Sequence, residues 1–152
     1  MRVQDVMTRR VQTIDDRASA ELAYDSMKVN KIRHLVVKNG SELVGVLSQR
    51  DLGVAEESDF REKHVVSELM NAHVVTVGPD ASVRQAANLM RGRTIGCLPV
   101  VEEGQRKRLV GIVTTSDLLE LLGRGVDRPA PGKRTNLSTR GPRVDPKVKR
   151  MR

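Results

Sequence analysis

Two short stretches of the chain, Gly45–Asp51 and Gly111–Asp117, carry residue types suited to binding a ribose and a phosphate. Each has a glycine in an apolar run, a serine or threonine three residues later, and an aspartate three residues after that. The glycine would let a flat ligand approach the backbone. The start of the helix that follows would offer free N–H groups to a phosphate, and the aspartate can accept two hydrogen bonds from a ribose diol.

Helix capping is the alternative interpretation of the same spacing. A serine or threonine three residues before an acidic residue forms a capping box, in which each side chain bonds the backbone N–H of the other residue. Any stable helix start can use this device. Capping does not require the upstream glycine, however, and that glycine occurs in both stretches. Both interpretations stay open at this point.

The two stretches belong to an internal duplication. A shift of 63 residues places Val3 on Val66 and aligns a series of identical residues in the two copies. After a three-residue insertion the match resumes with Leu43–Gly45 on Leu109–Gly111. The further matches are Met7 with Met70, Val11 with Val74, Thr13 with Thr76, Ala18-Ser19 with Ala81-Ser82, Ala23 with Ala86, Met27 with Met90, Ile32 with Ile95, Leu35 with Leu98, and Asp51-Leu52 with Asp117-Leu118. The identities are too many for chance, and they establish two structural repeats.

Hydrophobic periodicity predicts the same order of elements, β-α-β-β-α, in both copies. Asn39 and Gly40 predict a hairpin turn, because both residues tolerate positive φ. One such unit has too little core to fold alone, so we expect an α/β fold with the two units packed sheet against sheet. The predicted segments are Val11–Ile14, Ala18–Met27, Leu35–Lys38, Leu43–Ser48 and a helix from Asp51, then Val74–Val77, Val83–Met90, Leu98–Val101, Leu109–Thr114 and a helix from Asp117.

The duplication and its motifs resemble a tandem pair of cystathionine-β-synthase (CBS) domains, the Bateman module. The resemblance covers about residues 1–122. It implies repeat 1 at 1–55, a linker at 56–64, repeat 2 at 65–122 and a tail at 123–152, with the repeats related by a pseudo-twofold axis. The segments that carry it are Arg33–Val37, Gly96–Val101, Leu109–Thr114, the two glycine-to-aspartate endings, and the lead-ins Val3–Thr8 and Val66–Asn71.

This resemblance implies a regulatory module and not an enzyme. Its ligand would be an adenine nucleotide (AMP, ADP or ATP) or S-adenosylmethionine, bound in the clefts between the repeats as a regulatory ligand, with no obligatory cofactor. Two such pairs would associate into a homodimer. The occupied state would be read by an effector protein in trans.

Transferred position by position, the family's site falls mainly on repeat 2. Asp117 would hold the ribose hydroxyls, and Thr114 with Ser116 would meet the phosphate. Arg33 and His34 of repeat 1 would also reach the phosphate, while the remaining residues would line the adenine slot. The residues implied are Asp117, Thr114, Ser116, Thr76, Gly96, Cys97, Pro99, Ile112, Arg33 and His34.

The reciprocal site in repeat 1 is expected to be weaker or empty. The residues that it would receive from repeat 2, Gly96 and Cys97, bring no charge. Val36 stands where the family usually has a proline, and an arginine stands where repeat 2 has a serine. The implied residues are Asp51, Ser48, Arg50 and Thr13.

Composition and missing motifs argue against other classes of protein. The content of 38% apolar and 30% charged residues is typical of a soluble domain, and Tyr24 and Phe60 are too few aromatic residues for folds that stack nucleic-acid bases. A single cysteine, Cys97, excludes an intrachain disulfide and a cysteine-rich zinc site. No apolar run approaches the length of a membrane span, and no catalytic signature occurs. We therefore expect a cytoplasmic protein with no catalytic residues and no metal site.

The net charge of +8 belongs to the tail. From Arg124 onward the chain has ten basic and two acidic residues, which leaves 17 of each in residues 1–123. The tail also holds four of the six prolines and has few apolar residues, so we expect it to be disordered or extended. This charge supports an alternative function, in which the repeats form a dimeric scaffold and residues 124–152 bind nucleic acid or another polyanion.

Overall fold

The structure, a computed structural model, describes residues 1–104 and 107–125. The predictions for residues 126–152, which form most of the expected tail, lie outside the described residues. Two similar α/β units follow one another along the chain, as the duplication predicts. Their main elements are β1 (Thr13–Asp15), α2 (Ala20–Asn30), β2 (His34–Asn39) and β3 (Glu42–Ser48), then α5 (Val83–Arg93), β4 (Cys97–Glu102), β5 (Arg108–Thr114) and α6 (Thr115–Arg124).

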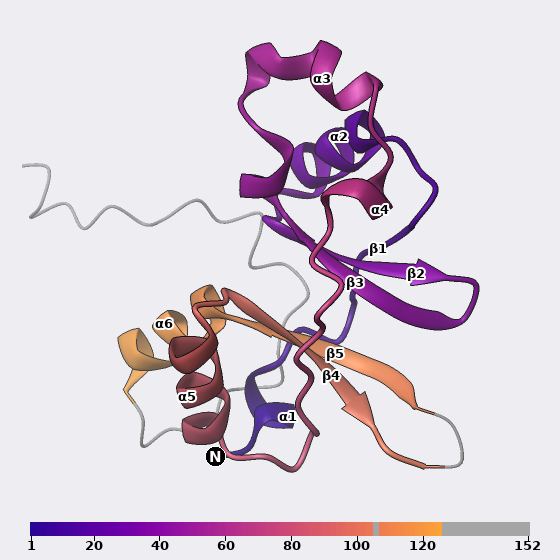
Figure 1. Cartoon of the computed structure of the whole chain (residues 1–152). Coiled ribbons are helices and arrows are strands. Elements are labelled where there is room, and N and C mark those ends of the chain that lie inside the picture. The colour runs from indigo at the N-terminus through magenta and orange to yellow at the C-terminus, as the bar shows by residue number, and fades with distance from the viewer. Residues whose placement is uncertain (105–106, 126–152) are drawn as a thin grey trace, which may run out of the picture.

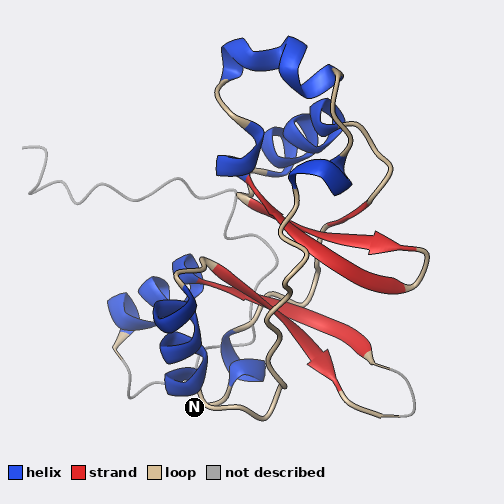
Figure 2. Cartoon of the chain, in the orientation of Figure 1, coloured by secondary structure: helices blue, strands red, loops and turns tan. Residues whose placement is uncertain are grey.

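Each unit has a small sheet built around an antiparallel hairpin. β2 pairs antiparallel with β3 and parallel with β1, while β4 pairs antiparallel with β5. The predicted hairpin between β2 and β3 is confirmed, but its turn residues are Gly40, with a φ of +61°, and Ser41, because Asn39 still pairs with Glu42. The two sheets face each other and their helices lie outside (Figure 2). A cluster centred on Val36, Cys97 and Ile112 fills the space between the sheets, which confirms the expected sheet-to-sheet packing.

The helices α2 and α5 have the same local design. Each begins after a serine, Ser19 or Ser82, whose hydroxyl accepts a hydrogen bond from the backbone N–H three residues later. Each ends at a residue with left-handed backbone, Lys31 or Thr94. Both helices bury alanine and methionine side chains against their own sheet, namely Ala20, Ala23 and Met27 in α2 and Ala86 and Met90 in α5.

The lead-in segments are exchanged between the repeats. The N-terminal helix α1 (Val3–Val6) lies beside α5 and α6 of repeat 2, whereas α4 (Val66–Leu69) lies on repeat 1 (Figure 1). Beyond each short helix the chain forms a two-bond bridge with the last strand of the repeat that it joins. Thr8 bonds Ile112 of β5 in both directions at 2.8 and 2.9 Å, and Asn71 bonds Val46 of β3 at 2.9 and 3.0 Å.

The predicted strand Val74–Val77 is wrong, because only Val77 pairs with a neighbour, forming an isolated parallel bridge to β4. The sequence difference at one position explains the loss. In repeat 1 the N–H of Val36 donates to Gln12 O at 3.2 Å and extends the pairing of β1. The equivalent residue in repeat 2 is Pro99, which has no N–H to donate.

The predicted helix from Asp51 is also wrong. The chain forms one 3₁₀ turn, η1 (Gln49–Leu52), and then breaks at Gly53, whose φ of +74° ends the helix. In repeat 2 the equivalent helix α6 continues for 10 residues. The segment expected to be a plain linker contains η2 (Ala55–Glu57) and a short helix, α3 (Ser58–Glu62).

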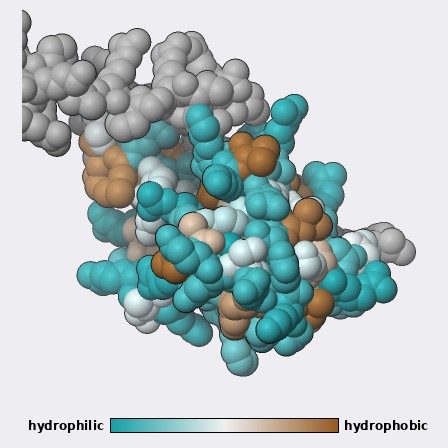
Figure 3. Space-filling model, turned by 90° about the horizontal axis from the view of Figure 1, so that it is seen from above, coloured by the Kyte–Doolittle hydropathy of each residue, from teal (hydrophilic) through white to brown (hydrophobic). Residues whose placement is uncertain are grey.

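The face at the repeat 1 end is mainly hydrophilic (Figure 3). Seen from the repeat 1 end, charged and polar side chains surround separate apolar ones (Figure 3). Among the described residues, no helix is long and apolar enough to cross a membrane.

Candidate functional site

The motif of repeat 2 forms a reciprocal capping box at the start of α6. Asp117 Oδ2 accepts a hydrogen bond from the backbone N–H of Thr114 at 2.8 Å, and Thr114 Oγ1 accepts one from the N–H of Asp117 at 3.2 Å. Both residues are half-buried, while Ser116 is exposed in the first turn of the helix. The capping interpretation is therefore correct for this pair, and the proposed ligand would have to contact side chains that are already ordered by the cap.

The motif of repeat 1 has the same spacing with different hydrogen bonds. Asp51 Oδ2 accepts from the backbone N–H of Ser48 at 2.8 Å and from its hydroxyl at 2.9 Å. Asp51 and the neighbouring Arg50 are exposed, as is Thr13, which pairs with Val36 in the sheet. The hydroxyl of repeat 1 thus donates to its own aspartate, whereas the hydroxyl of repeat 2 accepts from the helix backbone.

The motif glycines make room for protein and not for a ligand, which corrects the sequence interpretation. A Cβ on Gly111 would lie 3.0 Å from Cγ of Met7 and 3.1 Å from Thr8 O. A Cβ on Gly45 would lie 3.0 Å from Cγ of Met70 and 3.2 Å from the backbone oxygen of Asn71. The exchanged lead-ins therefore occupy the space at both glycines. The repeated glycine marks the exchange of segments between the repeats.

The start of β4 lies directly beside the repeat 2 motif. Gly96 O accepts a hydrogen bond from the N–H of Thr115 at 3.0 Å, and Cys97 pairs with Thr114 across the hairpin. Pro99 pairs with Ile112 further along the same two strands, and all three of the side chains Cys97, Pro99 and Ile112 are buried. They can shape the wall of a cleft, but Cys97 and Ile112 face the core between the sheets.

Thr76 and Cys97 differ in their exposure. Thr76 is exposed, and the next residue, Val77, donates its N–H to Pro99 O at 3.1 Å, which places the threonine beside β4. Burial raises the pKa of the Cys97 thiol to about 12. Because the thiolate is the reactive form, this cysteine is a small core residue with little nucleophilic character at neutral pH.

His34 is a polar side chain of repeat 1 that reaches the start of β4 in repeat 2. Its Nε2 would lie 3.2 Å from a Cβ on Gly96, so the ring packs on the glycine that borders the repeat 2 motif. Burial lowers the pKa of His34; the carboxylate of Asp51 opposes this shift, and Arg33 and Arg50 add to it. The structure thus brings a half-buried imidazole, with a lowered pKa, to the junction of the repeats.

The predicted residues therefore gather in two groups related by the duplication. Thr114, Ser116 and Asp117 lie beside the start of β4, and His34 approaches this group from repeat 1. In the second group, the backbone oxygen of Arg33 accepts a hydrogen bond from the N–H of Gln49 at 2.8 Å. Arg33, whose side chain is exposed, therefore borders the repeat 1 motif. Their contacts with a ligand stay predictions.

Two further features lie away from these groups. An open hollow of about 440 Å³ is bordered by Gln4, Arg9, Pro79, Glu102 and Arg108, at the hairpin end of β4 and β5 opposite the motif. Within the part of the chain that the structure describes, no group of three His, Cys, Asp or Glu side chains could hold a metal ion.

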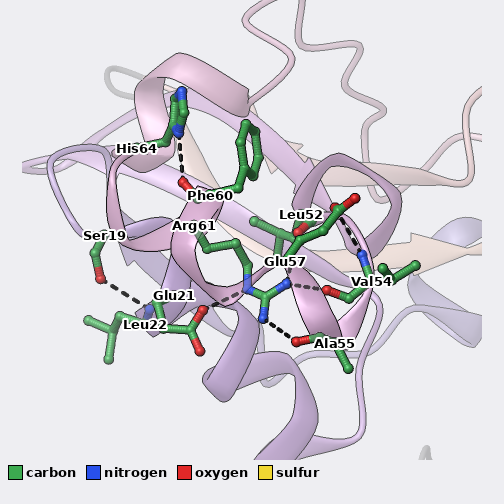
Figure 4. A network of polar contacts seen from close by, with 10 residues as sticks. All are labelled: Ser19, Glu21, Leu22, Leu52, Val54, Ala55, Glu57, Phe60, Arg61 and His64. Carbon is green, nitrogen blue, oxygen red and sulfur yellow. Dashed lines mark hydrogen bonds and ion pairs between the residues drawn. The ribbon is translucent and has the colours of Figure 1, made fainter.

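Arg61, which sequence reasoning placed in a charged linker, is only 1% exposed. Its guanidinium contacts Glu21 and three backbone carbonyls (Figure 4). No local pattern distinguishes Arg61 from the other arginines of the chain. The one sequence signal is Gly53, which ends the helix before Arg61 and so allows the linker to fold back on repeat 1.

Comparison with known proteins agrees with this geometry. A family model described as CBS domain matches residues 3–53 and 66–124. A CBS domain-containing protein of Dictyostelium discoideum is 36% identical over 132 residues, which cover 79% of this chain and 90% of that protein. A homoserine O-acetyltransferase of Methanohalobium evestigatum is 33% identical over 79% of this chain, but the match spans only 24% of the enzyme.

A solved structure extends the comparison to the fold. The CBS domain pair of protein MJ0100, in complex with 5′-methylthioadenosine and S-adenosyl-L-methionine, superimposes with a TM-score of 0.71 at 27% sequence identity. The match covers 82% of this chain and 97% of that one. The shared fold therefore includes both repeats and both motif regions.

Proposed function

The chain belongs to the CBS domain family, and we propose that its two repeats form a regulatory module that binds AMP, ADP, ATP or S-adenosylmethionine in the clefts between them. Binding would shift the packing of the repeats, and an effector protein in trans would read that shift. A homodimer of two such pairs is part of the proposal, as is a cytoplasmic location.

The similarity to the MJ0100 pair carries the proposal, because that pair holds two adenosyl compounds and shares the arrangement of both repeats. The local structure here is compatible with such a ligand. The positive end of the α6 helix dipole and the hydroxyl of Ser116 lie on one side, and His34 from repeat 1 lies on the other.

In this proposal Asp117 holds the ribose hydroxyls, and Thr114 with Ser116 meets the phosphate. The backbone of Gly96–Leu98 lines the adenine slot together with Thr76 and the buried Pro99. Arg33 and His34 approach from repeat 1, where the first can neutralise a phosphate and the second can take up a proton beside it. The reciprocal site of Asp51, Ser48, Arg50 and Thr13 is the weaker one.

A thermal-shift screen with AMP, ADP, ATP, 5′-methylthioadenosine and S-adenosylmethionine tests the proposal. A ligand at a hundredfold excess over its dissociation constant should stabilise the fold by about 2.7 kcal/mol, because it binds the native state alone. If none of these compounds raises the melting temperature at millimolar concentration, the chain does not bind adenosyl ligands and the proposal is wrong.

The matched variants are Asp117→Asn and Asp5→Asn. Both aspartates accept a backbone N–H at 2.8 Å in a capping box, Asp117 from Thr114 and Asp5 from Arg2, and asparagine preserves an acceptor in each. We expect Asp117→Asn to reduce the ligand-induced shift strongly, since an amide cannot accept two bonds from a ribose diol as a carboxylate does. Asp5→Asn should leave it unchanged. Equal losses in both variants would contradict the role of Asp117.

A second candidate function rests on the charge of residues 124–152, which hold ten of the 27 basic residues. This segment would bind nucleic acid or another polyanion by counterion release, with the repeats as a dimeric scaffold. Truncation after Gly123 should then remove a steeply salt-dependent affinity for DNA or RNA. Binding that survives truncation would eliminate this candidate.

A further inference from the structure

Arg61 is the only charged residue among the described ones that is fully buried. Its Nε donates to Glu21 Oε2 at 2.7 Å in the first turn of α2. The two terminal nitrogens donate to backbone carbonyls, from Nη1 to Leu52 at 3.2 Å and Val54 at 2.5 Å, and from Nη2 to Ala55 at 3.2 Å. The guanidinium also lies 3.8 Å from the centre of the Tyr24 ring. Figure 4 shows the chain from Leu52 to Ala55 wrapped around the guanidinium.

Of the three carbonyls that Arg61 binds, only that of Leu52 belongs to the turn that replaces the helix. Val54 and Ala55 lie beyond Gly53, and Val54 O also accepts the N–H of Glu57 at 3.0 Å. A helix leaves its last carbonyls without partners, and a single 3₁₀ turn has few internal bonds to spare. In repeat 2, α6 continues past its motif and bonds its own backbone. In repeat 1 the helix stops at Leu52, and the side chain of Arg61, nine residues away, donates to the Leu52 carbonyl. The guanidinium therefore caps the truncated helix from outside.

The capped turn carries the aspartate of the repeat 1 motif. Leu52, whose carbonyl Arg61 binds, is itself buried in the core of repeat 1 and directly follows Asp51. Asp51 in turn holds the Ser48 backbone through its carboxylate. The Arg61 contacts thus fix the carboxyl end of the turn, while Ser48 fixes its start.

We propose that Arg61 is the positioning residue of the repeat 1 site: it holds Asp51 in place for a ribose by capping the turn that carries it. This inference rests on the proposed adenosyl-binding function. The planar guanidinium suits the role, because it directs donors to Glu21 and to several carbonyls at once while its face lies on Tyr24. A lysine ammonium is a point charge and can reproduce only part of this arrangement.

Backbone hydrogen exchange, measured on the full chain, tests the positioning directly. Arg61→Met should speed amide hydrogen exchange across 49–55 by about tenfold or more. Without the hydrogen bonds to Arg61, local opening of this segment costs less free energy. Exchange across 114–124 should change by less than about twofold, and Arg61→Lys should give an intermediate result. Glu21→Gln keeps the three carbonyl contacts and provides a milder test if Arg61→Met does not fold. Unchanged exchange across 49–55, or equal acceleration in both segments, would overturn the inference.

AMP binding separates this role from general destabilisation. The Asp117→Asn background leaves the repeat 1 site as the main binding site, and Asp51→Asn leaves the repeat 2 site. We expect Arg61→Lys to weaken AMP binding by about tenfold in the first background and by less than about twofold in the second, at a temperature where both variants are folded. Equal weakening in both backgrounds, or none in the first, would overturn the positioning role. If the wild-type chain binds no adenosyl compound at all, the proposed function fails, and the exchange result alone decides the role of Arg61.

Discussion

The two repeats share one sequence pattern and end in different ways. Repeat 1 ends in the 3₁₀ turn Gln49–Leu52, held by the buried Arg61, which is paired with the half-buried Glu21. Repeat 2 ends in the ten-residue helix α6, where the pair of Arg124 and Glu120 lies partly in solvent. The same duplicated motif is thus supported by a buried charge in one copy and by a regular helix in the other.

This difference shows that a duplicated motif does not guarantee two equivalent sites. Helix α6 satisfies its own backbone and places Leu121 in the core of repeat 2. The turn in repeat 1 lacks these bonds, so its order depends on a side chain from a separate segment. We therefore expect the repeat 1 motif to respond more strongly to changes far from the cleft.

The largest contrast should come from removing the two arginines. Arg61→Met leaves Glu21 partly buried without its partner and frees the carbonyls around Leu52, at a cost of about 3–5 kcal/mol. Arg124→Met removes a pair that is accessible to water, at a cost of about 0–1 kcal/mol. Urea denaturation of both variants measures the difference. Similar losses would show that the two ends are supported alike.

The motif glycines should show where the repeats remain equivalent. Gly45→Ala and Gly111→Ala each press a methyl group against an exchanged lead-in and should cost about 1–3 kcal/mol. Gly92→Ala, on α5 with no atom within 4 Å of the new methyl group, should stabilise by about 0.5–1 kcal/mol. Denaturation midpoints measure all three. A neutral Gly111→Ala would mean that Met7 adapts easily and that the lead-ins fit the two repeats differently.

The hydroxyls of the two motifs should differ in their contribution to stability. Thr114 caps a helix of 10 residues, so Thr114→Ala should cost about 1 kcal/mol. The Ser48 hydroxyl donates to an exposed carboxylate at the start of a short turn, and Ser48→Ala should cost only about 0.5 kcal/mol or less. Equal costs, measured by thermal or urea unfolding, would contradict the difference in hydrogen bonding between the two caps.

The smallest effect concerns His34 and Cys97, which occupy equivalent positions in the duplication. Burial lowers the pKa of His34 in the folded chain, so the unfolded chain takes up a proton first as the pH falls below about 6.5. The contribution of the uncharged His34 to the free energy of unfolding should be fully present above that pH and decline below it. His34→Gln should flatten the decline between pH 7 and 5, relative to wild type. Cys97, with a pKa of about 12, stays protonated throughout this range. A decline that is unchanged in His34→Gln would assign it to other groups.

Much of the fold could be predicted because its signals are local. Continuous apolar runs mark the strands of the hairpins, and the glycine of Asn39-Gly40 marks the turn that joins β2 to β3. The serine caps of α2 and α5 are local in the same way. The missing strand at 74–77 could be recognised only from the partner strand, because Pro99 removes a donor from the far side of the pairing.

The site was predicted only in part. The pairing of Thr114 with Asp117 follows from their spacing, whereas the approach of His34 to Gly96 came from the family resemblance and depends on how the repeats dock. The glycines were assigned the wrong role, since a glycine is required wherever any atom comes close. The spacing of the residues does not say whether that atom belongs to a ligand or to Met7.

The sequence by itself determined the duplication, the order of elements within each repeat and the position of the two motifs, because these depend on periodicity and on contacts between near neighbours. Only the tertiary structure decided that the lead-ins change places, that the motif glycines accommodate methionines, and that Arg61 caps the end of repeat 1. These features depend on which of two similar surfaces a segment meets after the chain has turned back. Because the duplicated surfaces share many of their apolar residues, the choice is set by packing in the whole molecule.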